Sequence, residues 1–275
     1  MGLAAVYASI RAHTRVKLCL YVLHDDSVDG LSKSMLEQSL VPGDRLLFRH
    51  ASSVPEAYEL SKKLDNRYSP AIIWRAWIGE YFYDLKRCLL LDCDLLFLCD
   101  VERLWKTRLG SSVLSAPIGG GWRLNDDYFQ WLNSSRESYF RMCVVLINLK
   151  KLRKSDRYCQ GRVKFLNDAF SRMGSGPGSY LLEQSLFNKF FSQLCKPLLF
   201  EVFAANRISE NSERHAYLSA KIAQKKPLIV DVKGWENDSE FSLLYWSFLL
   251  RTAWFSFAQK AWAGFMKQEP PRSPS

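Results

Sequence analysis

The sequence predicts an α/β fold in which helices flank a mixed, mostly parallel sheet. Short apolar runs have the length and composition of buried strands, and segments with apolar residues at helical spacing separate them. Strands that alternate with helices are typical of layered α/β folds. No repeat, heptad pattern or Pro-rich linker divides the chain. We therefore expect one domain followed by a C-terminal appendage.

The first half of the chain alternates helices and strands. Apolar residues at helical spacing between Leu3 and Ile10 predict a helix over residues 2–13. The expected elements that follow are a strand over 16–23, a helix over 32–40 that stops before Pro42, a strand over 46–48, a helix over 70–84 and a strand that begins at Cys88.

The second half contains a predicted loop-rich insertion over residues 119–138, which opens with three consecutive glycines. The other expected elements are strands over 112–116, 143–149 and 227–231, helices over 156–170 and 180–194, and a flexible connector over 173–179.

The C-terminal region is rich in aromatic and basic residues. Over residues 241–267 this pattern suits a helix lying in the interface of an anionic membrane, although such a stripe is more often packed on the core. Its Arg and Lys residues argue against a spanning helix. Residues 268–275, with three Pro, are expected to be disordered. The expected boundaries are therefore 1–240, 241–267 and 268–275.

Two carboxylates interrupt the apolar strand that begins at Cys88. An unpaired buried carboxylate costs several kcal/mol, so the strand must pause at Asp92 and Asp94. Residues i and i+2 of an extended segment point the same way, which would let both side chains offer oxygens to a hard divalent cation or to sugar hydroxyls. The alternative interpretation is a strand that ends in an acidic turn.

Composition limits the classes of partner. The chain has 275 residues and a formal charge of +10, which favours an anionic partner such as a nucleotide phosphate or an acidic lipid. Its basic residues are dispersed and form no nucleic-acid module, so we expect no nucleic acid partner. Seven Cys without a Cys-x-x-Cys pair indicate reduced core residues of a cytosolic protein. No signal peptide and no clear membrane span are predicted.

Three motifs in order resemble the family 8 glycosyltransferases. They are the Asp92 strand with the following Leu104 and Trp105, the segment from Tyr139 to Lys151, and the segment from Glu183 to Asn188. That family contains retaining enzymes of the GT-A fold, including bacterial lipopolysaccharide galactosyl- and glucosyltransferases, and the resemblance covers roughly residues 3–255. It implies transfer of a hexose from a UDP-sugar to a glycan or lipid-linked acceptor, with Mn²⁺ or Mg²⁺ as cofactor.

The resemblance also implies a metal site. Asp92 and Asp94 would bind the cation, and Asp92 would lie near the ribose. Asp231 stands where the family has a His ligand, and an all-oxygen set would favour manganese or magnesium over softer metals. Arg75 would contact the donor, although as a helix residue it is about equally well explained as a solvated charge.

Several positions depart from the family pattern. Arg141 stands where the family has an Asn that lines the donor sugar. Glu183 and Gln184 replace Asp-Gln, and Gln184 keeps the position below the anomeric carbon. Gly234 is retained near the end, whereas the diphosphate-binding Lys is lost and Lys233 is the nearest replacement.

These departures leave function and mechanism open. One alternative is a catalytically weak or inactive member that binds a glycan or a partner, which the residues at Arg141, Ser185 and Asn237 would motivate. For an active enzyme, Gln184 is a poor nucleophile and Glu183 is the carboxylate of that motif, so same-face attack guided by the leaving phosphate is at least as well supported as a covalent intermediate. The expected location is the cytoplasm, with peripheral attachment to the inner face of the membrane.

The resembled family places a strand before its first helix, and that strand holds the uracil and ribose. Here the helix over residues 2–13 comes first. A parallel sheet that lacks a central strand exposes unpaired backbone groups. We therefore expect the coding sequence to extend upstream and this chain alone to bind UDP weakly.

Overall fold

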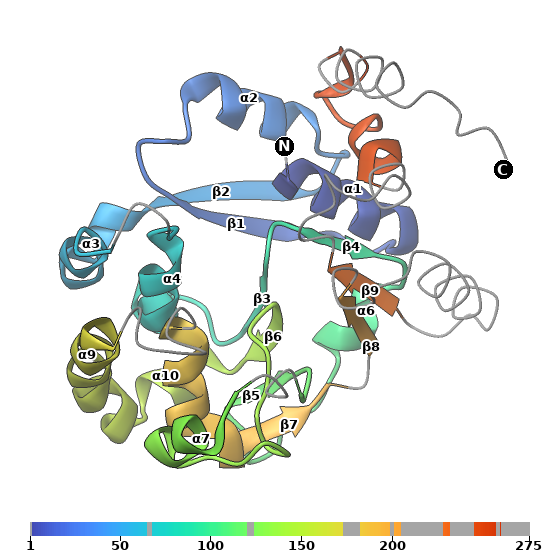
Figure 1. Ribbon diagram of the computed structural model, residues 1–275. Coiled ribbons are helices and arrows are strands. Elements are labelled where there is room, and N and C mark those ends of the chain that lie inside the picture. The colour runs from blue at the N-terminus through green and yellow to red at the C-terminus, as the bar shows by residue number, and fades with distance from the viewer. Residues whose placement is uncertain are drawn as a thin grey trace, which may run out of the picture.

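The computed structural model describes residues 2–64, 68–119, 124–172, 182–198, 201–204, 228–231, 245–256 and 259, and it confirms the α/β class (Figure 1). In the first part of the chain the elements are α1 (Gly2–His13), β1 (Cys19–His24), α2 (Gly30–Gln38), β2 (Arg45–His50), η1 (Ala51–Ser53), α3 (Pro55–Ser61), α4 (Ala71–Trp74), η2 (Arg75–Trp77), α5 (Ile78–Tyr81), β3 (Cys88–Leu91), β4 (Leu95–Phe97) and α6 (Val101–Trp105). They are followed by β5 (Leu114–Ala116), α7 (Asp126–Leu132), β6 (Val144–Ile147), α8 (Leu149–Arg153), α9 (Asp156–Ser171), α10 (Leu182–Phe191), η4 (Ser192–Leu194), β7 (Cys195–Pro197), β8 (Glu201–Ala204) and β9 (Leu228–Asp231).

Asp44 joins α1 to the first pair of strands. β1 and β2 run parallel, with Cys19 opposite Arg45. The Tyr7 hydroxyl donates to Asp44 Oδ2 at 2.7 Å, and the backbone N–H of Leu18 donates to Oδ1 at 2.8 Å. This carboxylate therefore holds the beginnings of both strands against α1.

The other described strands form two sheets, with orders β3-β6-β5-β7 and β4-β9-β8. The pairs β1–β2, β5–β7 and β8–β9 are parallel, whereas β3–β6, β5–β6 and β4–β9 are antiparallel. The sheets are mixed, as predicted, but parallel pairs do not predominate. Local sequence pattern specifies which segments are strands and leaves their direction of pairing open.

The apolar run that begins at Cys88 forms two strands rather than one. β3 pairs with β6, whereas β4 pairs with β9, so the chain changes sheets between Leu91 and Leu95. The pause expected at the two carboxylates is confirmed. α1 covers the edge of β4, where the Ser9 hydroxyl accepts the backbone N–H of Phe97 at 3.0 Å.

The helix predicted over residues 70–84 is divided into α4, η2 and α5. Trp77 has φ −114° and ψ 21°, which interrupts the helix. Its indole donates to Glu56 Oε2 at 2.8 Å, and the buried Arg162 guanidinium lies 4.4 Å from its ring centroid. These contacts with α3 and α9 override the helical pattern of the sequence.

The predicted loop-rich insertion contains α7. The Asn125 side chain caps this helix by accepting the backbone N–H of Tyr128, and Asp126 and Asp127 occupy its first turn. The prediction of a loop-rich insertion therefore missed this helix. Strands β7 and β8 were not predicted from the sequence. The predicted connector over 173–179 lies outside the described residues.

The main core lies between the β3-β6-β5-β7 sheet and the helices α4, α7, α9 and α10. All seven cysteines are free. Cys99 and Cys143 are buried, but Cys19 and Cys93 are exposed, so the core assignment was wrong for these two.

The beginning of the appendage packs on the core. Tyr245, Trp246 and Phe248 are buried in a cluster with residues of α1, including Ala4 and Ala5. For these three residues the alternative explanation, packing on the core, is confirmed. Attachment of the segment to a membrane stays a prediction. Most of 257–267, like 268–275, lies outside the described residues. Within the part of the chain that is described, no helix combines the length and apolar character needed to span a bilayer.

Candidate active site

Asp92, Cys93 and Asp94 form a turn between two sheets. Asp92 directly follows β3, and Asp94 directly precedes β4. The backbone N–H of Asp92 donates to the carbonyl of Cys143 at 2.9 Å, which fixes the turn to the start of β6. The segment is a turn and not extended, so the predicted alignment of the two side chains on one side of a strand is wrong. The two carboxylates instead flank the point where the chain crosses between sheets.

The first described residue of α1 packs against this turn. A Cβ atom at Gly2 would lie 2.4 Å from the carbonyl oxygen of Cys93. No side chain is tolerated at that distance, so the approach of α1 requires glycine here.

We expect Gly2→Ala to push the Asp92–Asp94 turn away from α1 and to destabilise the fold by about 1–3 kcal/mol, as overpacking does. Gly30→Ala is the matched control, because Gly30 begins α2 and a Cβ there meets nothing within 4 Å. Since Ala favours helix, that control should melt slightly higher than the wild type. Thermal unfolding of both variants decides: a wild-type midpoint for Gly2→Ala would show that the turn does not need this contact.

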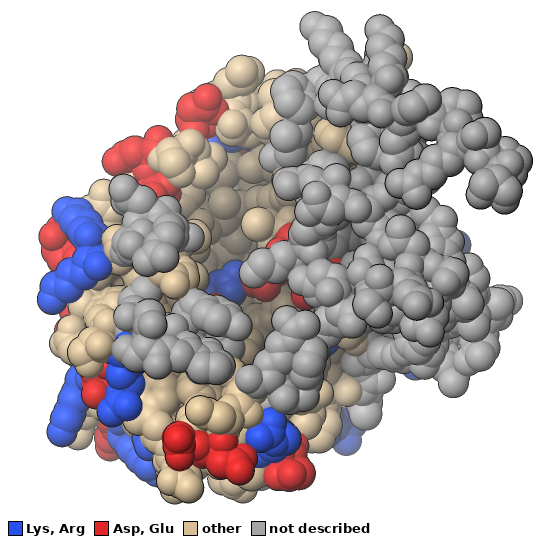
Figure 2. All heavy atoms as spheres, viewed as in Figure 1, with Lys and Arg blue, Asp and Glu red and all other residues tan. Residues whose placement is uncertain are grey.

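Arg75 connects the turn to α10. Its Nη2 lies 2.5 Å from Asp92 Oδ1, and its Nη1 lies 3.3 Å from Glu183 Oε1. The exposed fraction of the Arg75 side chain is 20%, so it is not a solvated helix charge. Figure 2 shows basic and acidic side chains meeting in the hollowed middle of this face, near the place of α4 and β3 in Figure 1. The structure therefore brings together three of the predicted site residues.

Burial and charge act against each other in this bridge. Burial raises the pKa of Glu183 above its ordinary value, although the nearby Arg75 pulls it down. Burial by itself would lower the pKa of Arg75, but Asp92 and Glu183 raise it, so the guanidinium stays charged. The bridge is one fixed positive charge between two acidic groups.

Gln184, next to Glu183 on α10, is half-buried and held at both ends of its amide. Its Oε1 accepts the backbone N–H of Met142 at 3.1 Å, and its Nε2 donates to the hydroxyl of Tyr139 at 2.8 Å. The neighbouring Ser185 is buried, and its hydroxyl is hydrogen-bonded to that of Tyr128.

Asn188 fixes the same face of α10 to the chain before β6. Its Oδ1 accepts the backbone N–H of Phe140 at 3.0 Å, and its Nδ2 donates to the Phe140 carbonyl at 2.9 Å. The Asn188 amide thus satisfies both backbone groups of Phe140, as a paired strand would, and attaches α10 to this segment. Tyr139 and Asn188 belong to the motifs of the sequence but had no predicted role. The hydrogen bonds that use them, to Gln184 and to Phe140, join segments 45 and 48 residues apart.

The other predicted donor residues are placed differently. The Arg141 guanidinium donates to the carbonyl of Val202 on β8 at 2.8 Å, so it holds a strand. Lys233 and Gly234 lie outside the described residues. Asp231 ends β9 and is paired in register with Leu95, the residue after Asp94.

The carboxylates of Asp92, Asp94 and Asp231 have the oxygen chemistry that suits a hard divalent cation. In the part of the chain that the structure describes, no three His, Cys, Asp or Glu side chains are arranged to hold a metal ion. Asp92 instead binds Arg75. The donors fit such a cation in kind, while the three-ligand set stays a prediction.

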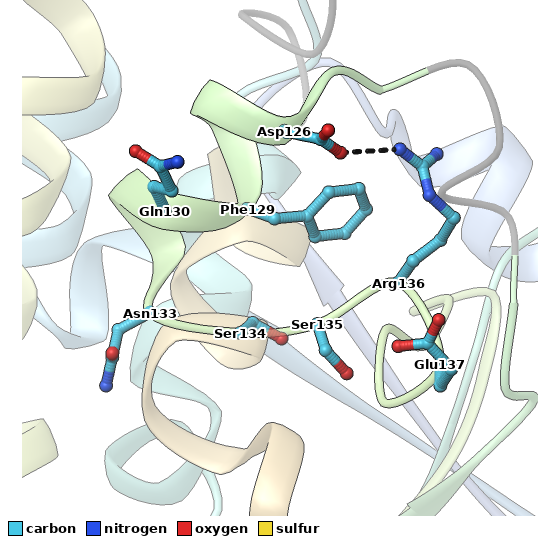
Figure 3. A pocket seen from close by; sticks show the side chains of 8 residues that line it. All are labelled: Asp126, Phe129, Gln130, Asn133, Ser134, Ser135, Arg136 and Glu137. Atoms are coloured by element: carbon cyan, nitrogen blue, oxygen red, sulfur yellow. Dashed lines mark hydrogen bonds and ion pairs between the residues drawn. The ribbon is translucent and has the colours of Figure 1, made fainter.

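A separate pocket of about 570 Å³ opens beside α7 (Figure 3). It is lined by Asp126, Phe129, Gln130, Asn133, Ser134, Ser135, Arg136 and Glu137. Arg136 pairs with Asp126 at 3.1 Å, and its guanidinium lies 4.8 Å from the Phe129 ring centroid. None of the predicted site residues lines this pocket.

Comparison with solved structures defines the class of fold. The bifunctional glycosyltransferase WbbM superposes with a TM-score of 0.67 at 17% identity, over 94% of this chain and 49% of that one. The galactosyltransferase LgtC, solved with donor and acceptor sugar analogues, gives a TM-score of 0.66 at 22% identity, over 90% of this chain and 91% of that one. The fold is therefore the GT-A fold of glycosyltransferases.

Sequence comparison identifies the family. Residues 1–223 match the model of glycosyl transferase family 8. A curated relative, the probable galacturonosyltransferase-like 6 of Arabidopsis thaliana, is 31% identical over 80 residues, which span 26% of this chain and 23% of that protein. The chain belongs to glycosyl transferase family 8.

Proposed function

We propose that this chain transfers a hexose from a UDP-sugar to a glycan or lipid-linked acceptor, with retention at the anomeric carbon and with the help of a divalent cation. The observation that carries the proposal is the Arg75 bridge, which links the Asp92–Asp94 turn to the Glu183–Gln184 pair. The bridge thereby joins the residues proposed to bind the cation to those proposed to face the sugar. Membership of family 8 supports sugar transfer as the reaction class.

Asp92 and Asp94 would hold Mn²⁺ or Mg²⁺, and Asp231, opposite Leu95, is the proposed third ligand. When bound, the cation supplies positive charge that stabilises the departing diphosphate. Arg75 lies against Asp92 and adds a second fixed charge at the same place. Cation and guanidinium would therefore share the Asp92 carboxylate.

The contacts of the two candidate nucleophiles favour same-face attack. Glu183 is held by Arg75, and Oε1 of Gln184 accepts the N–H of Met142. In same-face attack the bond between the anomeric carbon and the β-phosphate oxygen breaks, and the acceptor oxygen bonds to that carbon on the same side. Its proton passes to the leaving phosphate oxygen. Gln184 would then orient the sugar without bonding to it.

The test is UDP release from a panel of UDP-hexoses, with and without added Mn²⁺, together with calorimetric titration of UDP. Metal-dependent release with one donor is the expected result. A chain that binds UDP but releases none from any donor would lack transferase activity. A chain that neither binds UDP nor releases it from any donor would favour the alternative, a member that binds a glycan or a partner. The structural support for this alternative is that Arg141, at a position predicted to line the donor sugar, instead holds β8.

A further inference from the structure

The hydrogen bonds around Gln184 determine how its amide is oriented. A backbone N–H can only donate, so the atom that faces Met142 must be the carbonyl oxygen of Gln184. The amide nitrogen then points to the Tyr139 hydroxyl, 2.8 Å away. The terminal torsion of a glutamine is broad and roughly two-fold. The Met142 N–H therefore selects the orientation of the amide, and the Tyr139 hydroxyl holds its other end in place.

Tyr139 is itself rigid. It is fully buried, and its ring meets Phe129 edge-on with centroids 5.7 Å apart. Its ring also packs against that of Tyr128, with centroids 6.4 Å apart, and the Tyr128 hydroxyl is hydrogen-bonded to Ser185. Burial raises the pKa of Tyr139 far above its ordinary value, so the hydroxyl stays neutral at any working pH. The two packed tyrosines thus contact α10 at successive residues, Tyr139 at Gln184 and Tyr128 at Ser185.

We propose that Tyr139 is a positioning residue for sugar transfer, which acts by fixing the Gln184 amide through its hydroxyl. The inference rests on the proposed function, in which Gln184 faces the donor sugar. Removing the hydroxyl leaves the Gln184 nitrogen without this acceptor, so the amide is held at its oxygen end only, by Met142, and its plane can tilt about that bond. The chemical step should suffer, while the diphosphate end of the donor, held near Asp92, should bind as before.

Tyr139→Phe tests the kinetic part. We expect kcat to fall roughly 10- to 100-fold, as for a misplaced group in an active site, with KM for the UDP-sugar unchanged within about two-fold. The matched control is Tyr81→Phe. Tyr81 is also fully buried, and its hydroxyl donates to the Ala51 carbonyl at 2.7 Å, far from α10 in the chain. That control should lose comparable stability and no activity.

A double-mutant cycle separates positioning from general damage. If Tyr139 acts through Gln184, then Tyr139→Phe should cause no further loss of kcat in a Gln184→Ala background. Thermal unfolding of each variant shows that it is folded at the assay temperature. Equal kcat for Tyr139→Phe and Tyr81→Phe, or fully additive losses in the cycle, would overturn the proposal.

A readout independent of activity comes from the side-chain amide of Gln184. Its ¹H–¹⁵N signals in deuterated protein are assigned by their loss in Gln184→Ala. We expect them to move toward the position of a solvent-exposed glutamine in Tyr139→Phe and to stay in place in Tyr81→Phe. Unmoved signals in Tyr139→Phe would refute the positioning contact. If the wild type releases no UDP while these signals shift as expected, the proposed function fails and the contact stands.

Discussion

Asp94→Asn should lower turnover at least roughly 100-fold, because it removes a negatively charged oxygen ligand at nearly constant side-chain volume. The fold should survive, since the substitution keeps the size of the side chain at the turn between β3 and β4. Metal affinity should fall with turnover. Turnover is measured as UDP release at saturating donor over a range of Mn²⁺ concentrations. Metal affinity is measured by electron paramagnetic resonance of free Mn²⁺.

The control for this substitution is Asp29→Asn. Asp29 is the N-cap of α2, where its side chain accepts the backbone N–H of Ser32, and Asn caps helices equally well. Asp29→Asn removes the same negative charge as Asp94→Asn, but at the start of α2 and far in sequence from the Asp92–Asp94 turn and from Arg75. A wild-type rate and wild-type Mn²⁺ affinity in Asp94→Asn would rule out Asp94 as a ligand.

The parts of the fold that sequence predicted are those with strong local signals. The helix over 156–170 is α9 (Asp156–Ser171), and the strand over 143–149 contains β6 (Val144–Ile147). The pause at Asp92 was also predictable, because a buried carboxylate demands a partner or a turn. In each case the physical cause lies within a few residues of the feature.

The features that sequence missed depend on distant partners. The antiparallel pairing of β4 with β9 joins Leu95 to Asp231, and no pattern near either residue encodes it. The interruption at Trp77 comes from contacts with α3 and α9. α7 is different, since an Asn N-cap followed by two acidic residues was a readable helix signal. The preceding three glycines outweighed it.

The same distinction applies to the site. Motif order identified the carboxylates at 92, 94 and 183, and Arg75 was predicted to contact the donor. The pairing of Arg75 with Asp92 and Glu183 was not predicted. Arg75 lies 108 residues before Glu183 and looked equally like a surface charge. Its burial and its two partners became visible only in the folded chain.

Arg75→Met should therefore be strongly destabilising, by about 3 kcal/mol near pH 7, because it leaves the buried carboxylate of Glu183 without its positively charged partner. Turnover should be lost as well. The pKa of Glu183 is already raised above its ordinary value of 4.5, and loss of Arg75 would raise it further. In the unfolded variant the pKa of Glu183 is the ordinary 4.5, and in the folded variant it is higher. At a pH between these two values the folded state binds more protons than the unfolded state, so stability falls as pH rises from about 4.5 through the folded pKa.

The destabilisation of Arg75→Met should thus be larger at pH 7 than at pH 5, which urea unfolding at both pH values measures. The stability of Arg75→Lys should lie between that of Arg75→Met and that of the wild type. A single ammonium keeps the charge but lacks the forked guanidinium that reaches both carboxylates. The decisive control is Glu183→Gln in the Arg75→Met background. It removes the uncompensated buried charge, so it should restore stability at pH 7 more than at pH 5. Equal destabilisation of Arg75→Met at both pH values, with no rescue by Glu183→Gln, would mean that Arg75 stabilises the fold by packing rather than by charge.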